Sequence, residues 1–375
     1  MTCKKISPED VTNEEITKLR SIKFVRIFAK FFGLYYGKNE HWLYKFYFFV
    51  GITINILNMI KSFFVYSLTD KFNTDTINNI INSLIYFSGL FNCIFMLVLH
   101  CKVNRIQSFM ENYDLVFKYV KDPKTLILKM NIMIYATFGL TFFSIFTNFS
   151  VQYMPIFMTT NTTLIAFLAP FESAEWALNS LAYKLLMSLF FYFSTVSTNG
   201  PLAYYFIHCN MLNFILNNFN SKFQSLIHRV YASNSNESNK EDFEEDFEEV
   251  FEWHKKICSL ISILNGCYKE LIAVNILALV PQIFLTLYIL SDPTGHCVPT
   301  GDLGAWIFYL IVILYSLAVI VVIAAKINTS VSLFFILINK LYSFCRTCRR
   351  LIWRLNKCLT CQFQTIQTNY VLRFF

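Results

Sequence analysis

Residues 252–290 place the strongest constraint on what this chain can fold into. The first half of the stretch is amphipathic, because apolar residues recur at helical spacing between Lys255, Lys256, Lys269 and Glu270. The second half, residues 271–290, has 20 residues and no charge. As a helix it would measure about 30 Å, which matches the hydrocarbon core of a bilayer. The pattern predicts one continuous helix that begins in the cytosol and then enters a membrane.

The rest of the chain has the composition of a membrane protein. It is 55% hydrophobic and only 15% charged, whereas a soluble domain carries about a quarter charged residues. The apolar residues are gathered in long blocks, so we expect an all-α, polytopic transmembrane bundle. Pro201 and Pro281 lie inside two of these blocks and are expected to bend their helices. The six predicted spans are residues 46–68, 80–99, 130–149, 181–207, 271–290 and 306–325.

The distribution of positive charge predicts the orientation of the bundle. With the amino terminus in the cytosol, the cytosolic segments hold 29 of the 32 Lys and Arg residues, as expected for cytosolic loops. The net charge of +8 is then a property of these loops, and no nucleic-acid partner is expected. Residues 1–45 become a cytosolic segment, and residues 326–375 a basic, Cys-rich cytosolic tail. The predicted location is the plasma membrane, and the expected partners are the lipid bilayer and a small molecule.

Two stretches stand apart from the predicted spans. Residues 232–249 are acidic and low in complexity, which predicts a disordered cytosolic loop without the spacing of a calcium site. Residues 331–344 are apolar but number only 14, too few to cross a bilayer. Helix four is expected to run on from its span through residue 228, and no seventh span is predicted.

Several residues are candidates for covalent modification. Asn148 and Asn161 begin glycosylation sequons in the predicted external loop, and Asn161 is the better acceptor because Asn148 lies almost in the membrane. Four cysteines next to a basic run could be acylated, could bind zinc or could simply be free thiols. The intervening residues look helical, so we assign no metal. The four are Cys345, Cys348, Cys358 and Cys361.

No enzyme motif is present in the sequence. It contains no His-Glu-x-x-His, no Gly-rich phosphate loop and no Gly-x-Ser-x-Gly. We therefore predict no catalytic residues, no cofactor and no enzymatic activity.

Polar residues inside the spans are the best candidates for a binding site, because they are costly in lipid and face the bundle interior. Those at mid-span are Asn55, Asn58, Asn92, Ser194, Asn275 and Gln282. The candidate ligand contacts toward the outer half are Tyr183, Tyr192, Gln282, Tyr288, Trp306 and Tyr309. They could line an apolar pocket with a few orienting hydrogen bonds. The alternative is that they form interhelical hydrogen bonds and interfacial aromatic belts.

Four features resemble the invertebrate gustatory receptor family, the chemoreceptors related to insect odorant receptors, including its nematode members. They are the aromatic-Gly segment Phe31-Phe32-Gly33-Leu34-Tyr35, the cytosolic amino terminus, the stretch from Ile257 to Tyr288, and the residues after span six, which include Ala324-Ala325-Lys326-Ile327-Asn328 and FQTIQTNYVLRF. The resemblance implies a homo- or hetero-oligomer of related subunits that pack through long cytosolic helix ends. It also implies a ligand-gated cation channel with a ligand pocket in the outer half.

The chain departs from the family where the seventh, pore-lining span is expected. The Thr-Tyr and Gln-Phe pattern of that span is absent, and the sequence ends where the span should begin. The expected function is a chemosensory receptor that binds a tastant or odorant. Two alternatives remain open, a nematode-type serpentine receptor coupled to a G protein and, ranked lower, a transporter with broken helices.

Overall fold

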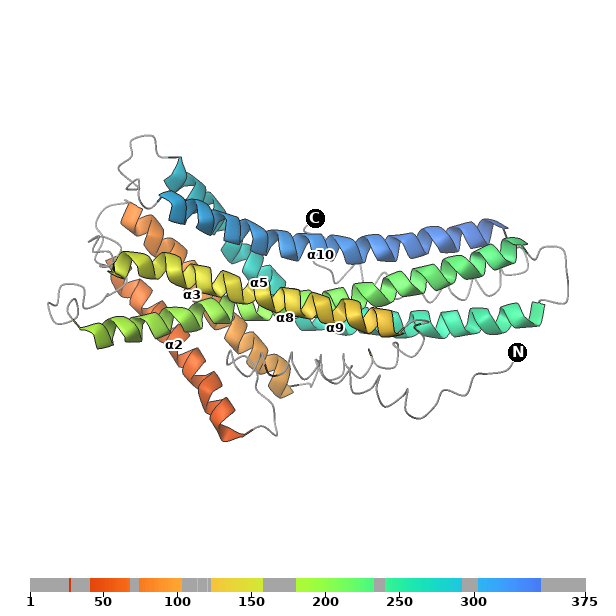
Figure 1. The fold of residues 1–375 in the computed structure, drawn as a ribbon, viewed down its shortest axis with the longest axis horizontal. Coiled ribbons are helices and arrows are strands. Elements are labelled where there is room, and N and C mark those ends of the chain that lie inside the picture. Colours follow the sequence, from red (N-terminus) through yellow and green to blue (C-terminus); the bar gives the residue numbers. More distant parts are fainter. Residues whose placement is uncertain are drawn as a thin grey trace. The chain divides into compact units, whose positions relative to one another are not determined.

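A computed structural model describes residues 41–67, 74–102, 123–157, 180–232, 240–291 and 303–344, together with Ile27, Tyr113 and Val120. Within these residues the chain is helical and has no strand (Figure 1). The helices are α2 (Trp42–Ser67), α3 (Thr74–Lys102), α5 (Pro123–Phe157), α8 (Leu181–Ala232), α9 (Lys240–Leu290) and α10 (Leu303–Phe344). The prediction of an all-α bundle is confirmed.

Five of the six predicted spans lie within one of these helices, and α2 contains residues 46–67 of the first. Four helices of the described chain are long and apolar enough to cross a membrane. The qualifying segments are Trp42–Lys61, Lys124–Phe143, Glu245–Leu290 and Trp306–Leu333. Helix α3 contributes a shorter apolar stretch, Ser83–Phe95. Helix α8 is less apolar because several Ser and Thr residues interrupt its first half, and these side chains are buried. The described chain is therefore that of a membrane protein.

Local chemistry explains several helix ends. The Ser180 hydroxyl accepts a hydrogen bond from the Tyr183 N–H at 3.2 Å and so caps the amino terminus of α8. His41 Nδ1 accepts from the Leu43 N–H at 3.3 Å and caps α2. Helix α5 begins at Pro123, whose missing N–H is not needed in a first turn.

The structure corrects four sequence predictions. Residues 240–249, predicted as disordered, form the first turns of α9, because Phe247 and Val250 lie on one helical face and are buried. Residues 150–157, predicted as loop, extend α5. Residues 331–344 continue the predicted sixth span within α10. Helices α8 and α9 are continuous through Pro201 and Pro281, whereas an interruption was expected at Pro201; the bends expected at the two prolines stay predictions.

The chain divides into two compact units, which we describe separately. Unit 1 is Met1–Val103, Ile132–Tyr205 and Glu270–Ile320; unit 2 is Asn104–Asn131, Phe206–Lys269 and Val321–Phe375. In unit 2, the indole ring of Trp253 is buried edge-on against Phe219, with ring centroids 5.2 Å apart. Ion pairs Lys222–Glu249 and Arg229–Asp246, each 2.7 Å, join α8 to the acidic start of α9. These contacts explain why the acidic segment is helical.

Unit 2 also contains a polar contact between α8 and α10. The Ser330 hydroxyl donates to Asn213 Oδ1 at 3.0 Å and to Asn217 Oδ1 at 3.2 Å. Asn220 Nδ2 in turn donates to the Ser330 backbone oxygen at 2.8 Å. These bonds fix the carboxyl-terminal half of α10 against α8 within the unit.

Candidate functional site

The first polar contact in unit 1 joins α2 to α8. Asn58 Nδ2 donates to the Ser194 hydroxyl at 2.8 Å and to the Phe190 backbone oxygen at 3.1 Å. One turn earlier on α2, Asn55 Nδ2 donates to the Ser197 hydroxyl at 3.0 Å. The two asparagines lie three residues apart and so share a helix face, which matches the spacing of their serine partners.

We call the interhelical contacts of Asn55, Asn58, Ser194 and Ser197 the polar seam, and this seam continues onto α3. The Cys93 thiol donates to the Ser197 hydroxyl at 3.1 Å. Thr198 Oγ1 donates to the Ser194 backbone oxygen at 3.0 Å and to the Ile85 backbone oxygen at 3.4 Å. The seam therefore links three helices through short hydroxyl, thiol and amide groups that are buried in the unit.

Asn92 and Asn275 form a reciprocal pair between α3 and α9. Asn275 Nδ2 donates to Asn92 Oδ1 at 3.0 Å, and Asn92 Nδ2 donates to Asn275 Oδ1 at 3.3 Å. Both side chains are 0% exposed. Asn92 also donates to the Thr198 backbone oxygen at 3.3 Å, so this pair joins the seam to α9. Of the six mid-span polar residues in the sequence prediction, five thus hydrogen-bond across helices within this seam.

The sixth, Gln282, lies in a different environment together with two of the aromatic candidates. Tyr309 Oη donates to Gln282 Oε1 at 3.0 Å, which links α10 to α9. The Trp306 and Tyr309 rings meet edge to face, with centroids 6.1 Å apart and an interplanar angle of 85°. We call Gln282, Trp306 and Tyr309 the Gln–aromatic group.

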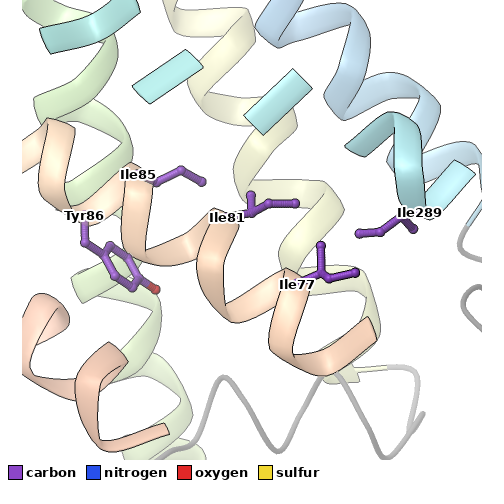
Figure 2. Packing of buried hydrophobic residues seen from close by; sticks show 5 residues of the cluster. All are labelled: Ile77, Ile81, Ile85, Tyr86 and Ile289. Carbon is purple, nitrogen blue, oxygen red and sulfur yellow. The ribbon is translucent and has the colours of Figure 1, made fainter. Parts of the chain in front are cut away.

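An apolar cluster borders this group. It consists of Ile77, Ile81, Ile85, Tyr86 and Ile289, with Leu285, Trp306 and Tyr309 packed against it. Figure 2 shows the three α3 isoleucines on one side of their helix, toward Ile289 of α9, while the Tyr86 ring lies on the other side. The isoleucines recur every four residues, which places them on one stripe of α3.

The contacts fix the relative direction of α3 and α9. Asn92 pairs with Asn275, whereas Ile77, fifteen positions earlier, clusters with Ile289, fourteen positions later. The two helices are therefore antiparallel. By this register Gln282 lies level with Ile85, about 10 Å along α9 from Asn275 at 1.5 Å per residue.

The remaining ligand candidates lie elsewhere. Tyr288 is 59% exposed. Tyr192 lies beside Phe193, whose ring centroid is 5.3 Å from that of Tyr47 on α2. Tyr183 is in the first turn of α8. The structure brings together Gln282, Trp306 and Tyr309 and does not show Tyr183, Tyr192 or Tyr288 joining them.

Of the residues that are candidates for covalent modification, few lie in the part of the chain that the structure describes. Asn148 lies within α5, while Asn161 and all four tail cysteines, Cys345, Cys348, Cys358 and Cys361, lie outside the described residues. In the part of the chain that the structure describes, no three His, Cys, Asp or Glu side chains gather as metal ligands would.

Sequence reasoning missed several members of the site. Ser197, Thr198 and Cys93 join the seam, and Ile85, Leu285 and Ile289 border the Gln–aromatic group. Small polar residues in α8 at spacings of three and four, Ser194, Ser197 and Thr198, were a usable signal for a polar interhelical face. The isoleucines carried no such signal, because apolar residues fill every span.

Comparisons with solved structures show that the fold of this chain is similar to that of an insect olfactory receptor. The olfactory receptor OR5 of the insect Machilis hrabei has a similar structure, with a TM-score of 0.61 and 13% identity, over 92% of this chain and 90% of that receptor. The same receptor in complex with eugenol matches with a TM-score of 0.59 and 12% identity, over 94% and 97%. No protein-family description matches the sequence, and no curated protein does. At this identity the likeness establishes the fold.

Proposed function

We propose that this chain is a chemosensory receptor of the gustatory type, which binds a small molecule at the plasma membrane. The observation that carries the proposal is the likeness of its fold to an olfactory receptor over at least nine-tenths of both chains. The resemblance of the sequence to gustatory receptors supports it independently, because it rests on motifs and not on the backbone. The absence of enzyme motifs from the sequence agrees with a receptor.

The proposed ligand site is the Gln–aromatic group. An aromatic pair, a single amide and a wall of isoleucines have the composition of a small-molecule pocket, which is mostly apolar with a few orienting polar groups. The polar residues of the seam are less suited, because their side chains already hydrogen-bond to other helices of the unit. Of the aromatic candidates, Trp306 and Tyr309 therefore contact the ligand together with Gln282, and Tyr183, Tyr192 and Tyr288 do not.

We further propose that the receptor acts as a subunit of an oligomeric, ligand-gated cation channel. One of the matched receptor structures contains eugenol, a neutral phenol, so eugenol is the first probe to test. In this proposal the amino terminus is cytosolic, residues 1–45 and 326–375 lie in the cytosol, and related subunits complete the channel.

Patch-clamp recording in cells without endogenous chemoreceptors tests this function. We expect a cation current during application of eugenol or another neutral aromatic compound, in cells dialysed with a hydrolysis-resistant GDP analogue that blocks G proteins. A current that disappears under this block would instead favour a G-protein-coupled receptor. Uptake of labelled probe without current would favour a transporter.

A further inference from the structure

Three asparagines of α8 lie in one stripe in unit 2. Asn213, Asn217 and Asn220 are spaced by four and three residues, which places them on the same side of the helix. We call them the asparagine ladder. The Ser330 hydroxyl of α10 donates to the first two, at 3.0 Å to Asn213 Oδ1 and at 3.2 Å to Asn217 Oδ1. A hydroxyl carries one proton, so these two acceptors share a single donor.

The third member of the ladder has an acceptor without a donor. Asn220 Nδ2 donates to the Ser330 backbone oxygen at 2.8 Å. A backbone oxygen only accepts, so this bond fixes which end of the amide is the nitrogen. Asn220 is 5% exposed, and its Oδ1 atom has no hydrogen-bond partner in the described part of the chain. Most buried polar groups do have partners, so this free acceptor requires an explanation.

The contacts of Ser330 show that α8 and α10 run parallel in unit 2. In an α-helix, side chains lean toward the amino terminus and backbone oxygens point toward the carboxyl terminus. The Ser330 side chain contacts Asn213 and Asn217, whereas its backbone oxygen contacts the ladder further along α8, at Asn220. A displacement of α10 toward its own carboxyl end therefore carries the Ser330 hydroxyl from the first pair of the ladder to the second pair, Asn217 and Asn220. The two pairs are about 5 Å apart along α8, which is one helical turn.

The displaced position keeps the number of hydrogen bonds. One turn before Ser330 lie Lys326 and Ile327. After the displacement, the Ile327 backbone oxygen takes the place of the Ser330 backbone oxygen and accepts from Asn220 Nδ2. The Lys326 side chain, which is exposed, can donate to Asn213 Oδ1 or remain in water. The Ser330 hydroxyl then supplies the donor that Asn220 Oδ1 lacks in the observed position.

We propose that the asparagine ladder gives the carboxyl-terminal half of α10 two registers on α8, the observed one and a second one displaced by one turn. In the second register the Ser330 hydroxyl donates to Asn217 and Asn220. Most residues from 321 to 339 are apolar, so the displacement replaces apolar side chains with other apolar side chains. Packed helices switch in such discrete steps because intermediate positions break both sets of contacts. This device is a property of unit 2 and depends neither on the ligand nor on ion conduction.

Pulsed electron–electron double resonance measures the two registers in the full-length protein in nanodiscs. Spin labels are attached to genetically encoded non-natural amino acids at Ser225 of α8 and Val322 of α10, so that the native cysteines stay unlabelled. Both positions are exposed. Val322 lies eight residues before Ser330 and Ser225 lies eight residues after Asn217, so the labels are about 24 Å apart along the helix axes. We expect two distances, the shorter by about 4–5 Å because the displacement brings Val322 one turn closer to Ser225.

Three substitutions separate the two registers. Asn213→Leu removes an acceptor that the Ser330 hydroxyl uses only in the observed register, so the ratio of short to long distances should rise about two- to fivefold, the range of a shared hydrogen bond. Asn220→Leu removes the acceptor that this hydroxyl uses only in the second register, so the ratio should fall by a similar factor. Asn218→Leu is the matched control, because Asn218 Nδ2 bonds within α8 to the Phe214 backbone oxygen at 2.9 Å. It should leave the ratio unchanged.

The outcomes separate this inference from the proposed function. A single distance in the unchanged protein overturns the inference, and so does a ratio that Asn220→Leu leaves unchanged. A ratio that Asn218→Leu lowers as strongly as Asn220→Leu also overturns it, because the effect would then not come from the ladder. Two distances that respond as expected, in a protein that passes no current, support the inference while the channel function fails. A ligand-evoked current in a protein with a single distance supports the receptor function while the inference fails.

Discussion

Gly89 is a position where three helices approach closely on the polar seam. A Cβ atom built on Gly89 would lie 2.9 Å from Asn55 Oδ1, 3.1 Å from the Ser194 backbone oxygen and 3.2 Å from Thr198 Oγ1. The backbone oxygen cannot move without displacing α8. Small residues at such crossings let helix backbones pack closely in membranes. The close packing of the helices at the polar seam therefore requires a glycine at this position.

We therefore predict that Gly89→Ala lowers the stability of the protein by about 1–3 kcal/mol, the usual cost of overpacking. The thermal unfolding midpoint in detergent measures the effect. Gly139→Ala on α5 is the matched control, because a Cβ there meets nothing within 4 Å and alanine favours a helix over glycine. Equal midpoints for Gly89→Ala and the unchanged protein would contradict the proposed close approach.

At the residue scale, the sequence identified the polar residues but not their partners. Asn55, Asn58, Asn92, Ser194 and Asn275 could be predicted as buried, since each interrupts an apolar block. Their pairing depends on the register of helices far apart in the chain; Asn58 and Ser194 are 136 residues apart. No local pattern encodes that register. The sequence alone therefore did not distinguish polar residues that line a ligand pocket from polar residues that hydrogen-bond between helices.

At the scale of elements, the reciprocal Asn92–Asn275 pair should couple α3 to α9. Replacing either residue with Leu leaves the other amide buried without its partner, at a cost of about 1–3 kcal/mol. Replacing both should cost less than the two single changes added together. We expect a coupling free energy of about 0.5–2 kcal/mol from a double-mutant cycle of unfolding measurements.

Asn210 provides the control for this cycle. Among the described residues, its amide bonds within α8, to the Phe206 backbone oxygen at 2.9 Å. The effects of Asn92→Leu and Asn210→Leu should therefore add. Additive effects for Asn92 and Asn275 would show that the pair does not bridge the two helices.

The ion pairs at the start of α9 allow a second test at this scale. Lys222 Nζ lies 2.7 Å from Glu249 and 5.7 Å above the Trp253 ring. Both charged side chains are partly exposed, so Glu249→Gln should cost only about 0.2–1 kcal/mol. Hydrogen exchange at the amides of residues 245–252 should then speed up at low salt. The difference should shrink at 1 M salt, where the Debye length is about 3 Å; an effect independent of salt would argue against the ion pair.

The positions of the helices could be predicted from the sequence better than their ends. Blocks of apolar residues located the helices, and four helices of the described chain have the length and apolarity that a bilayer demands. The first turns of α9 were missed because the eight charged residues among residues 240–249 outweighed the spacing of Phe247, Val250 and Trp253. The structure shows these three residues to be buried. Composition describes the average polarity of a whole segment, whereas burial depends on the residues of one helix face.

At the scale of the whole molecule, the predicted orientation places the sequon at Asn161 outside the cell. Two further sequons, Asn236-Glu-Ser and Asn328-Thr-Ser, fall in the predicted cytosolic segments. We expect a glycosidase to reduce the apparent mass of the protein from cell membranes, and Asn161→Gln to abolish that change. Asn236→Gln and Asn328→Gln should have no effect. A mass change that survives in Asn161→Gln but is lost in Asn328→Gln would reverse the orientation.

The polar seam has a consequence for how the protein is made. Asn55 Nδ2 binds the Ser197 hydroxyl, 142 residues further along the chain. Because protein synthesis adds about 5–20 residues per second, α2 is in the membrane for roughly ten to thirty seconds before its partner Ser197 is synthesised. During that interval its asparagines are exposed to lipid or bound by an assisting factor.

A chain truncated after residue 157 never acquires these partners. Pulse-chase labelling should therefore show rapid degradation of the truncated chain, and the double substitution Asn55→Leu with Asn58→Leu should slow that degradation. The residues that stabilise the complete protein would thus promote the degradation of its incomplete chain.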